Sequence, residues 1–188
     1  MIATRVLCRP FTSRVMNGTI MKDAVTKGPT FPRYGHNHLM GRGASELTLK
    51  DHVYFSKATA SGAGRNGIVE SNGDKPLKLV MDTPKAAGGK GEGQNPEQLF
   101  AMGYSACFLG ALQLAASRVD KRELVEQAKV NAAVFLGHPE DPNMDGFGLR
   151  VELTVEGCDD DAIISAAHEF CPYSRALTQG ADVKVLKL

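Results

Sequence analysis

The chain has 188 residues, a formal net charge of +1 and 43% hydrophobic residues. This size and composition predict one globular domain with enough apolar residues to bury a core. A near-neutral charge argues against a general nucleic-acid binder, which would carry a concentrated basic face. No purely apolar run reaches the roughly 20 residues of a membrane span; residues 95–119 come nearest but include two glutamines and two serines. We therefore expect neither nucleic-acid binding nor a membrane span.

The first 50 residues differ in composition from the rest of the chain. Residues 1–22 contain three arginines and one lysine, with serine and threonine among apolar residues, and no acidic residue. This composition is typical of a mitochondrial transit segment. The expected location is therefore mitochondrial, or cytoplasmic if the segment is only a disordered basic tail. Residues 23–50, rich in Gly, Pro, Asn and His, are predicted to form a linker or irregular arm, which leaves residues 51–188 for the folded domain.

Three short strands are expected in the first part of this domain. Alternating, β-branched and aromatic residues predict them at 52–61, 68–71 and 76–82. The glycine-rich stretch Gly62–Gly67 between the first two predicts a hairpin turn. Residues 83–94, again rich in glycine, are expected to form a loop without the order of residues that binds phosphate.

The second half of the domain predicts two more strands, two helices and a terminal strand. Residues 128–137 and 147–157 alternate strongly and are expected to be strands. Asp159 or Asp160 can cap a helix that continues to residue 170. A short helix is then expected from Pro172, and residues 182–188 predict a last strand.

A long helix is expected between these two halves, over residues 95–119. Asn95 is a suitable N-cap, Pro96 a suitable first helical residue, and Glu97 places a carboxylate in the first turn. No charged residue occurs from 99 to 116. We therefore expect this helix to be buried on most of its sides.

Cys107 lies near the middle of that helix. Gly103 and Gly110 occupy the same side, four residues before it and three after it. Two glycines within a helix cost roughly 1 kcal/mol each relative to alanine. Their presence indicates that another backbone, or a ligand, comes close to the sulfur. A lone cysteine in an apolar helix is most often inert packing, so its meaning depends on the rest of the chain.

The other cysteines do not form a zinc motif or a dense disulfide scaffold, which favours a reducing compartment with reactive thiols. Cys171 directly precedes Pro172, so it is expected to be the N-cap of the short helix, where a thiolate is stabilised. It could also merely cap this joint. Cys158 is followed by three aspartates and is expected to be unreactive.

Arg65, in the hairpin turn, has two interpretations. It is either a solvated turn residue, or a guanidinium carried over a site by a glycine-flanked loop. In the second case Arg65 could assist the reduction of a peroxide by Cys107 and Cys171. For these two thiols to form a disulfide, their Cα atoms must come within about 7 Å of each other. One thiolate attacks the O–O bond and becomes a sulfenic acid, and the other closes a disulfide. Arg65 can hold the first thiol ionised, and Glu97 can hold Arg65 in place.

These residues resemble those of the organic hydroperoxide resistance (Ohr) family, within the wider Ohr/OsmC group of thiol peroxidases. The similar blocks are the GRNG turn, the run NPEQLFAMGYSACFLGAL and the later CPYSRAL, and the resemblance covers about residues 50–188. It implies an α+β fold of curved antiparallel sheets packed around two central helices, in an intertwined homodimer with sites at the interface. It also implies Cys107 as peroxidatic thiol, Cys171 as resolving thiol, and Arg65 and Glu97 as the pair that activates Cys107.

The resemblance further implies reduction of organic hydroperoxides, including those of fatty acids. The disulfide would be recycled by dihydrolipoamide or a lipoylated protein, with no metal or other cofactor. Two departures stand out. The first 50 residues have no counterpart in the compact bacterial members, and Arg175 stands where members commonly have a neutral polar residue.

Three alternatives are weighed against this hypothesis. One is an OsmC-type peroxidase with a different peroxide preference, against which the CPYS block argues. Another is a non-enzymatic dimer that binds a fatty acyl ligand, in which both thiols and Arg65 would be coincidental. The third is a zinc site formed by Cys107, His168 and Cys171, which lacks a fourth ligand and the usual close spacing.

Overall fold

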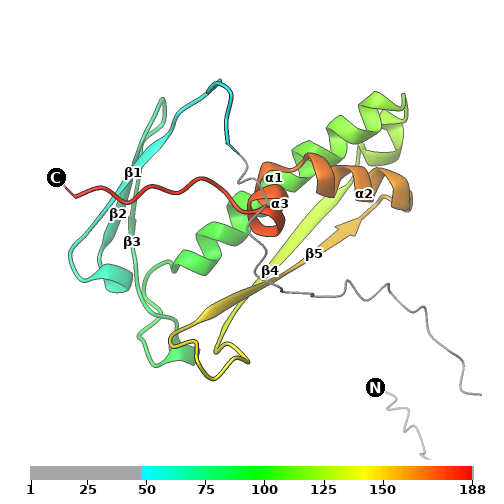
Figure 1. Ribbon diagram of the computed structural model, residues 1–188. Helices are drawn as coiled ribbons and strands as arrows, with labels where there is room; N and C mark the ends of the chain where they lie inside the picture. The colour runs from blue at the N-terminus through cyan, green and yellow to red at the C-terminus, as the bar shows by residue number, and fades with distance from the viewer. Residues whose placement is uncertain (1–47, 188) are drawn as a thin grey trace, which may run out of the picture. The chain divides into compact units, whose positions relative to one another are not determined.

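Two antiparallel sheets and three α-helices make up residues 48–187, the part of the chain that this computed structural model describes (Figure 1). The strands are β1 (Lys57–Ser61), β2 (Ile68–Asn72), β3 (Leu77–Val80), β4 (Lys129–Gly137) and β5 (Gly148–Glu156). The α-helices are α1 (Pro96–Arg118), α2 (Asp161–Phe170) and α3 (Pro172–Gln179), with short 3-10 turns η1 (Gly64–Asn66), η2 (Lys85–Ala87) and η3 (Arg122–Val125). The fold is α+β, as expected. The expected transit segment 1–22 and nearly all of the arm 23–50 lie outside the described residues.

The first sheet has the strand order β1-β2-β3. The pairing of Ser61 with Ile68 closes the predicted hairpin, and η1 forms its tip. Gly62 and Gly64 adopt φ angles of 83° and 62°, which glycine accepts without strain. The first strand begins only at Lys57, so the prediction of strand at residues 52–56 was wrong: they have the composition of a strand, but no strand among residues 48–187 pairs with them.

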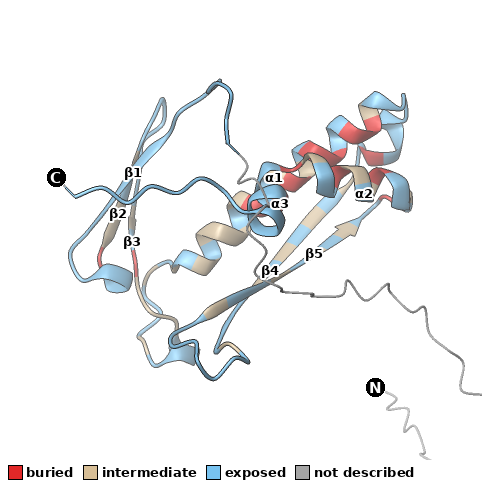
Figure 2. Ribbon diagram, in the orientation of Figure 1, coloured by how far each residue is buried: buried red, intermediate tan, exposed pale blue. Residues whose placement is uncertain are grey.

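The second sheet is the hairpin of β4 and β5, paired over all nine residues of each strand. Both strands were expected from their alternating residues, and β4 packs on α1. Helix α2 also packs on α1, and its N-cap is Asp160: the carboxylate of Asp160 accepts hydrogen bonds from the amides of Ala162 and Ile163. The core therefore forms around α1 and α2, where the buried residues gather (Figure 2).

Helix α1 begins where the sequence predicts. Asn95 caps it by accepting from the amide of Gln98, and the Gln98 side chain accepts from the amide of Asn95 in return, a full capping box. The core-facing side of α1 carries Leu112 and Ala116, both fully buried, and Ala167 of α2 is buried in the same cluster. These contacts, more than helix propensity, stabilise the helix.

The rest of α1 contradicts the expectation of burial on most sides. Met102 is 65% exposed and Leu114 is 45% exposed. A single chain supplies neighbours for only part of an apolar helix surface, so the remainder faces outward. By length and composition α1 would also suffice to cross a bilayer, but a core helix passes the same test, and its buried residues pack within the domain core.

The predicted terminal strand, 182–188, does not form within the described part of the chain, which ends at residue 187. Residues 180–187 have no regular structure, although Val183 and Val185 alternate as in a strand and are 77% and 94% exposed. A strand needs a hydrogen-bonding partner, and none of the five strands pairs with this segment. The alternation alone was therefore insufficient evidence within one chain.

Candidate redox site

Helices α1 and α3 bring two thiols together. The Sγ atoms of Cys107 and Cys171 lie 3.2 Å apart, although the residues are 64 positions apart in the chain. Both are free thiols; Cys171 is fully buried, whereas Cys107 is partly exposed. Because a disulfide bond measures about 2.05 Å, the sulfurs need to approach by only about 1 Å to form one.

A backbone amide at the N-terminus of α3 donates a hydrogen bond to Cys107, and not to the N-cap residue Cys171. Cys171 is the N-cap residue of α3, as predicted, but its side chain accepts no capping hydrogen bond. The amide of Tyr173, in the first turn of α3, instead donates to the thiol of Cys107. Burial raises the pKa of Cys107, this amide lowers it, and the hydrogen bond with Cys171 raises it, so the pKa lies above its ordinary value within one chain.

Gly103 lies against the side chain of Tyr173 in α3. A Cβ atom at this position would lie 3.2 Å from the hydroxyl oxygen of Tyr173 and 3.3 Å from its ring. That ring stacks on Phe100, with ring centroids 5.9 Å apart. The expectation was a backbone or a ligand close to the sulfur; at Gly103 the structure places the side chain of Tyr173 instead. At Gly110, by contrast, a Cβ would meet nothing within 4 Å among the described residues.

Sequence reasoning missed a buried hydroxyl pair at the same contact. Tyr104 Oη and Ser174 Oγ lie 2.9 Å apart, and both residues are buried. Burial raises the pKa of Tyr104, and the hydrogen bond with Ser174 only partly offsets this. The available signal was positional: Tyr104 is three residues before Cys107, and Ser174 is three residues after Cys171.

Arg65 and Glu97 form a second pair. The guanidinium donates to the Glu97 carboxylate at 2.5 Å, and the Arg65 side chain remains 45% exposed. Partial burial raises the pKa of Glu97, but the hydrogen bond from Arg65, the backbone hydrogen bond and the charge of Arg65 together hold the pKa below its ordinary value. An ion pair this exposed contributes little to stability. It borders a cavity of about 510 Å³ whose other lining residues include Ala101, Val134 and Leu136.

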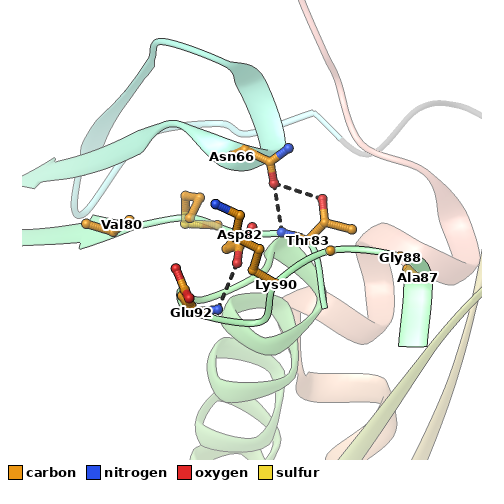
Figure 3. Close-up of a pocket in the computed structure, with 10 residues that line it drawn as sticks. Asn66, Val80, Asp82, Thr83, Ala87, Gly88, Lys90 and Glu92 are labelled. Atoms are coloured by element: carbon orange, nitrogen blue, oxygen red, sulfur yellow. Dashed lines mark hydrogen bonds between the residues drawn. The ribbon is translucent and has the colours of Figure 1, made fainter. Parts of the chain in front are cut away.

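The turn that carries Arg65 is tied to the loop before α1. Asn66 Oδ1 accepts from both the amide and the hydroxyl of Thr83, each at 2.8 Å (Figure 3). Asp82 in turn accepts from the amide of Glu92 at 2.7 Å, which closes the loop on itself. These residues line a separate cavity of about 670 Å³ to which neither thiol contributes. The hydrogen bonds between Asn66 and Thr83 hold the turn that carries Arg65 against the loop before α1.

The structure thus joins the four predicted site residues in two pairs. Glu97 and Cys107 are ten positions apart in α1, which at 1.5 Å per residue is about 15 Å along the helix axis. Within one chain, Arg65 paired to Glu97 is therefore not in contact with Cys107. The described residues also contain no group of three or more His, Cys, Asp or Glu side chains that could hold a metal, so nothing supports the zinc alternative with His168.

Two adjacent thiols on neighbouring helices of an α+β domain define a candidate thiol redox protein. The profile of the OsmC-like protein family matches residues 89–186. An organic hydroperoxide resistance protein of Xanthomonas axonopodis pv. citri is 42% identical over 137 residues, which cover 70% of this chain and 92% of that protein. For the organic hydroperoxide resistance protein OhrB of Bacillus subtilis the values are 37% over 139 residues, 71% and 96%.

Solved structures agree with this. An organic hydroperoxide resistance protein of Vibrio cholerae, with captopril bound in one of the active sites, has a TM-score of 0.60 and 38% identity, covering 72% of this chain and 92% of that one. One from Legionella pneumophila has a TM-score of 0.58 and 41% identity, covering 71% and 96%. The chain therefore belongs to the Ohr/OsmC family.

Proposed function

We propose that this protein is a Cys-based peroxidase that reduces organic hydroperoxides, including lipid hydroperoxides, to alcohols. The observation that carries the proposal is the 3.2 Å separation of the Cys107 and Cys171 sulfurs in a chain of this family. The Cys107 thiolate attacks the terminal peroxide oxygen; the alkoxide leaves and takes a proton to become the alcohol. The Cys171 thiol then attacks the Cys107 sulfenic acid, which gives a disulfide and water.

The two thiols differ in ways that support these roles. Cys107 is partly exposed, so a peroxide can reach it, whereas Cys171 is fully buried. Cys107 also accepts a hydrogen bond from the backbone amide of Tyr173, which favours the thiolate form. The apolar residues around the Arg65–Glu97 pair suit the alkyl part of an organic hydroperoxide.

We further propose that the active unit is a homodimer in which the Arg65–Glu97 pair of one subunit faces Cys107 of the other. The distance of about 15 Å along α1 and the raised pKa of Cys107 both call for a cation from another chain. Every residue of β1 is exposed, and so is Met102 on α1. The unpaired segment 180–187 is available to a second copy as a strand.

The reductant provides the test of the proposed function. We expect purified protein to consume tert-butyl or lipid hydroperoxide catalytically with dihydrolipoamide, because a dithiol can reduce the Cys107–Cys171 disulfide and leave as a cyclic disulfide. Peroxide consumption is to be compared with dihydrolipoamide, thioredoxin or glutathione as the only electron donor. Turnover with thioredoxin or glutathione but not dihydrolipoamide would contradict recycling by lipoyl groups.

We also propose a mitochondrial location, supported only by the composition of residues 1–22. When these residues are fused to a fluorescent reporter in eukaryotic cells, we expect the reporter to colocalise with a mitochondrial marker. Replacing Arg5, Arg9 and Arg14 with glutamate in the fusion should leave it diffuse, since import requires the basic segment. A diffuse signal from the unaltered fusion would favour the cytoplasm instead.

A further inference from the structure

One buried hydrogen bond joins the two helices that carry the thiols. Its partners are Tyr104 Oη of α1 and Ser174 Oγ of α3, 2.9 Å apart. Tyr104 is 3% exposed, and Ser174, fully buried, is the one buried residue of polar type among the described residues. A hydroxyl removed from water at this depth requires a partner, and each of these two supplies it for the other.

The bond lies one helical turn from each sulfur. Tyr104 precedes Cys107 by three positions on α1, and Ser174 follows Cys171 by three positions on α3. Side chains three positions apart share one face of a helix. The hydroxyl contact and the sulfur contact are therefore neighbouring points of the same interface between α1 and α3. The distances agree with this: 2.9 Å between the hydroxyl oxygens and 3.2 Å between the sulfurs.

This bond differs from the other polar contacts between α1 and α3 in one important respect. The sulfur–sulfur contact and the hydrogen bond from the Tyr173 amide both involve the Cys107 sulfur, the atom that reacts. When that sulfur gains an oxygen, both contacts must change. The Tyr104–Ser174 bond includes no reacting atom, so the chemistry at sulfur does not by itself break it.

The position of α3 depends on such contacts. The helix has only eight residues, and residues 180–187 after it have no regular structure. A helix this short is not stable in isolation. Besides its contacts with α1, which include the stacking of Tyr173 on Phe100, it is bound to α2 by Arg175, whose Nε donates to the carbonyl oxygen of Glu169 at 2.6 Å.

We propose that Tyr104 and Ser174 are positioning residues that hold Cys171 within reach of the Cys107 sulfenic acid and so favour disulfide closure over further oxidation. This inference rests on the proposed function. The sulfenic acid has two fates. Attack by the Cys171 thiol forms the S–S bond and releases water, whereas a second hydroperoxide molecule adds an oxygen, is itself reduced to the alcohol, and leaves a sulfinic acid. The position of α3 sets the rate of the first fate only.

The test is the double variant Tyr104→Phe/Ser174→Ala. It removes both hydroxyls together, so no buried polar group is left without a partner and the fold is retained. We expect the rate of Cys107 oxidation by hydroperoxide to stay within about twofold of wild type, while disulfide closure slows about tenfold, the effect of losing one hydrogen bond. Mass spectrometry should then find about tenfold more Cys107 sulfinic acid per turnover at equal peroxide.

Ser105→Ala is the matched control. Its hydroxyl lies on the next residue of α1 but donates to the carbonyl of Met102 in the same helix, so its loss should leave the ratio of disulfide to sulfinic acid unchanged. If Tyr104 and Ser174 only stabilised the fold, the double variant would likewise leave the ratio of disulfide to sulfinic acid unchanged. Tyr104→Phe alone, which retains the ring, provides a second measurement if the double variant is unstable.

The outcomes separate the two proposals. An unchanged ratio in both the double variant and Tyr104→Phe, with wild-type oxidation of Cys107, overturns the positioning role and leaves the peroxidase intact. Wild-type protein whose Cys107 is not oxidised by hydroperoxide overturns the proposed function, and the positioning role with it. A shifted ratio with normal oxidation supports the inference.

Discussion

Cys107→Ser is expected to abolish hydroperoxide consumption, with a fall of about a thousandfold or more in kcat/KM. A serine hydroxyl is not ionised near neutral pH and cannot attack the O–O bond as a thiolate does. The change replaces one sulfur with oxygen at a partly exposed position, so the core around Leu112 remains intact. The measurement is peroxide loss over time with dihydrolipoamide in excess.

Cys171→Ser should give a different result. Cys107 can still be oxidised, so with one equivalent of hydroperoxide each subunit should release one equivalent of alcohol and stop at the sulfenic acid, which a sulfenic-acid-specific reagent will trap. Cys158→Ala is the control, because Cys158 is buried in the core and the sulfur contact is between Cys107 and Cys171 alone. Full activity in Cys107→Ser, or full turnover in Cys171→Ser, would contradict the assigned roles.

Local signals in the sequence were sufficient for most of the fold. The helix starts could be predicted from Asn95, Pro96 and Asp160, because capping depends on a few neighbouring residues. Alternation identifies β4 and β5 because each strand finds its partner in the same hairpin. The failures share one feature: among the described residues of one chain, neither the terminal strand nor the outer side of α1 has the neighbours that it would need.

The candidate site follows the same division. Residue chemistry and family resemblance were enough to select Cys107 and Cys171, whose sulfurs the structure places in contact. The Tyr173 amide and the Tyr104–Ser174 bond were missed because they depend on how α1 and α3 are rotated against each other. That rotation follows from packing, such as the ring of Tyr173 over Gly103, and no local pattern encodes it.

The second large effect concerns Arg65. We expect Arg65→Met homodimers and Cys107→Ser homodimers to be nearly inactive when assayed separately. A heterodimer of one Arg65→Met subunit and one Cys107→Ser subunit, isolated with two different tags, should regain about half of wild-type activity per dimer. The reason is geometric: the intact Cys107 of the first subunit would face the intact Arg65 of the second, which restores one of two sites.

This rescue has a physical basis in the pKa of Cys107. Burial raises that pKa within one chain, and Arg65 is paired with Glu97 about 15 Å away along α1. A guanidinium from the partner would lower the pKa, so alkylation of Cys107 should require higher pH in Arg65→Met homodimers than in wild type. The control heterodimer pairs Arg65→Met with the double variant Arg65→Met/Cys107→Ser, where neither arrangement restores a site. Equal activity in the two heterodimers would rule out a site shared between subunits.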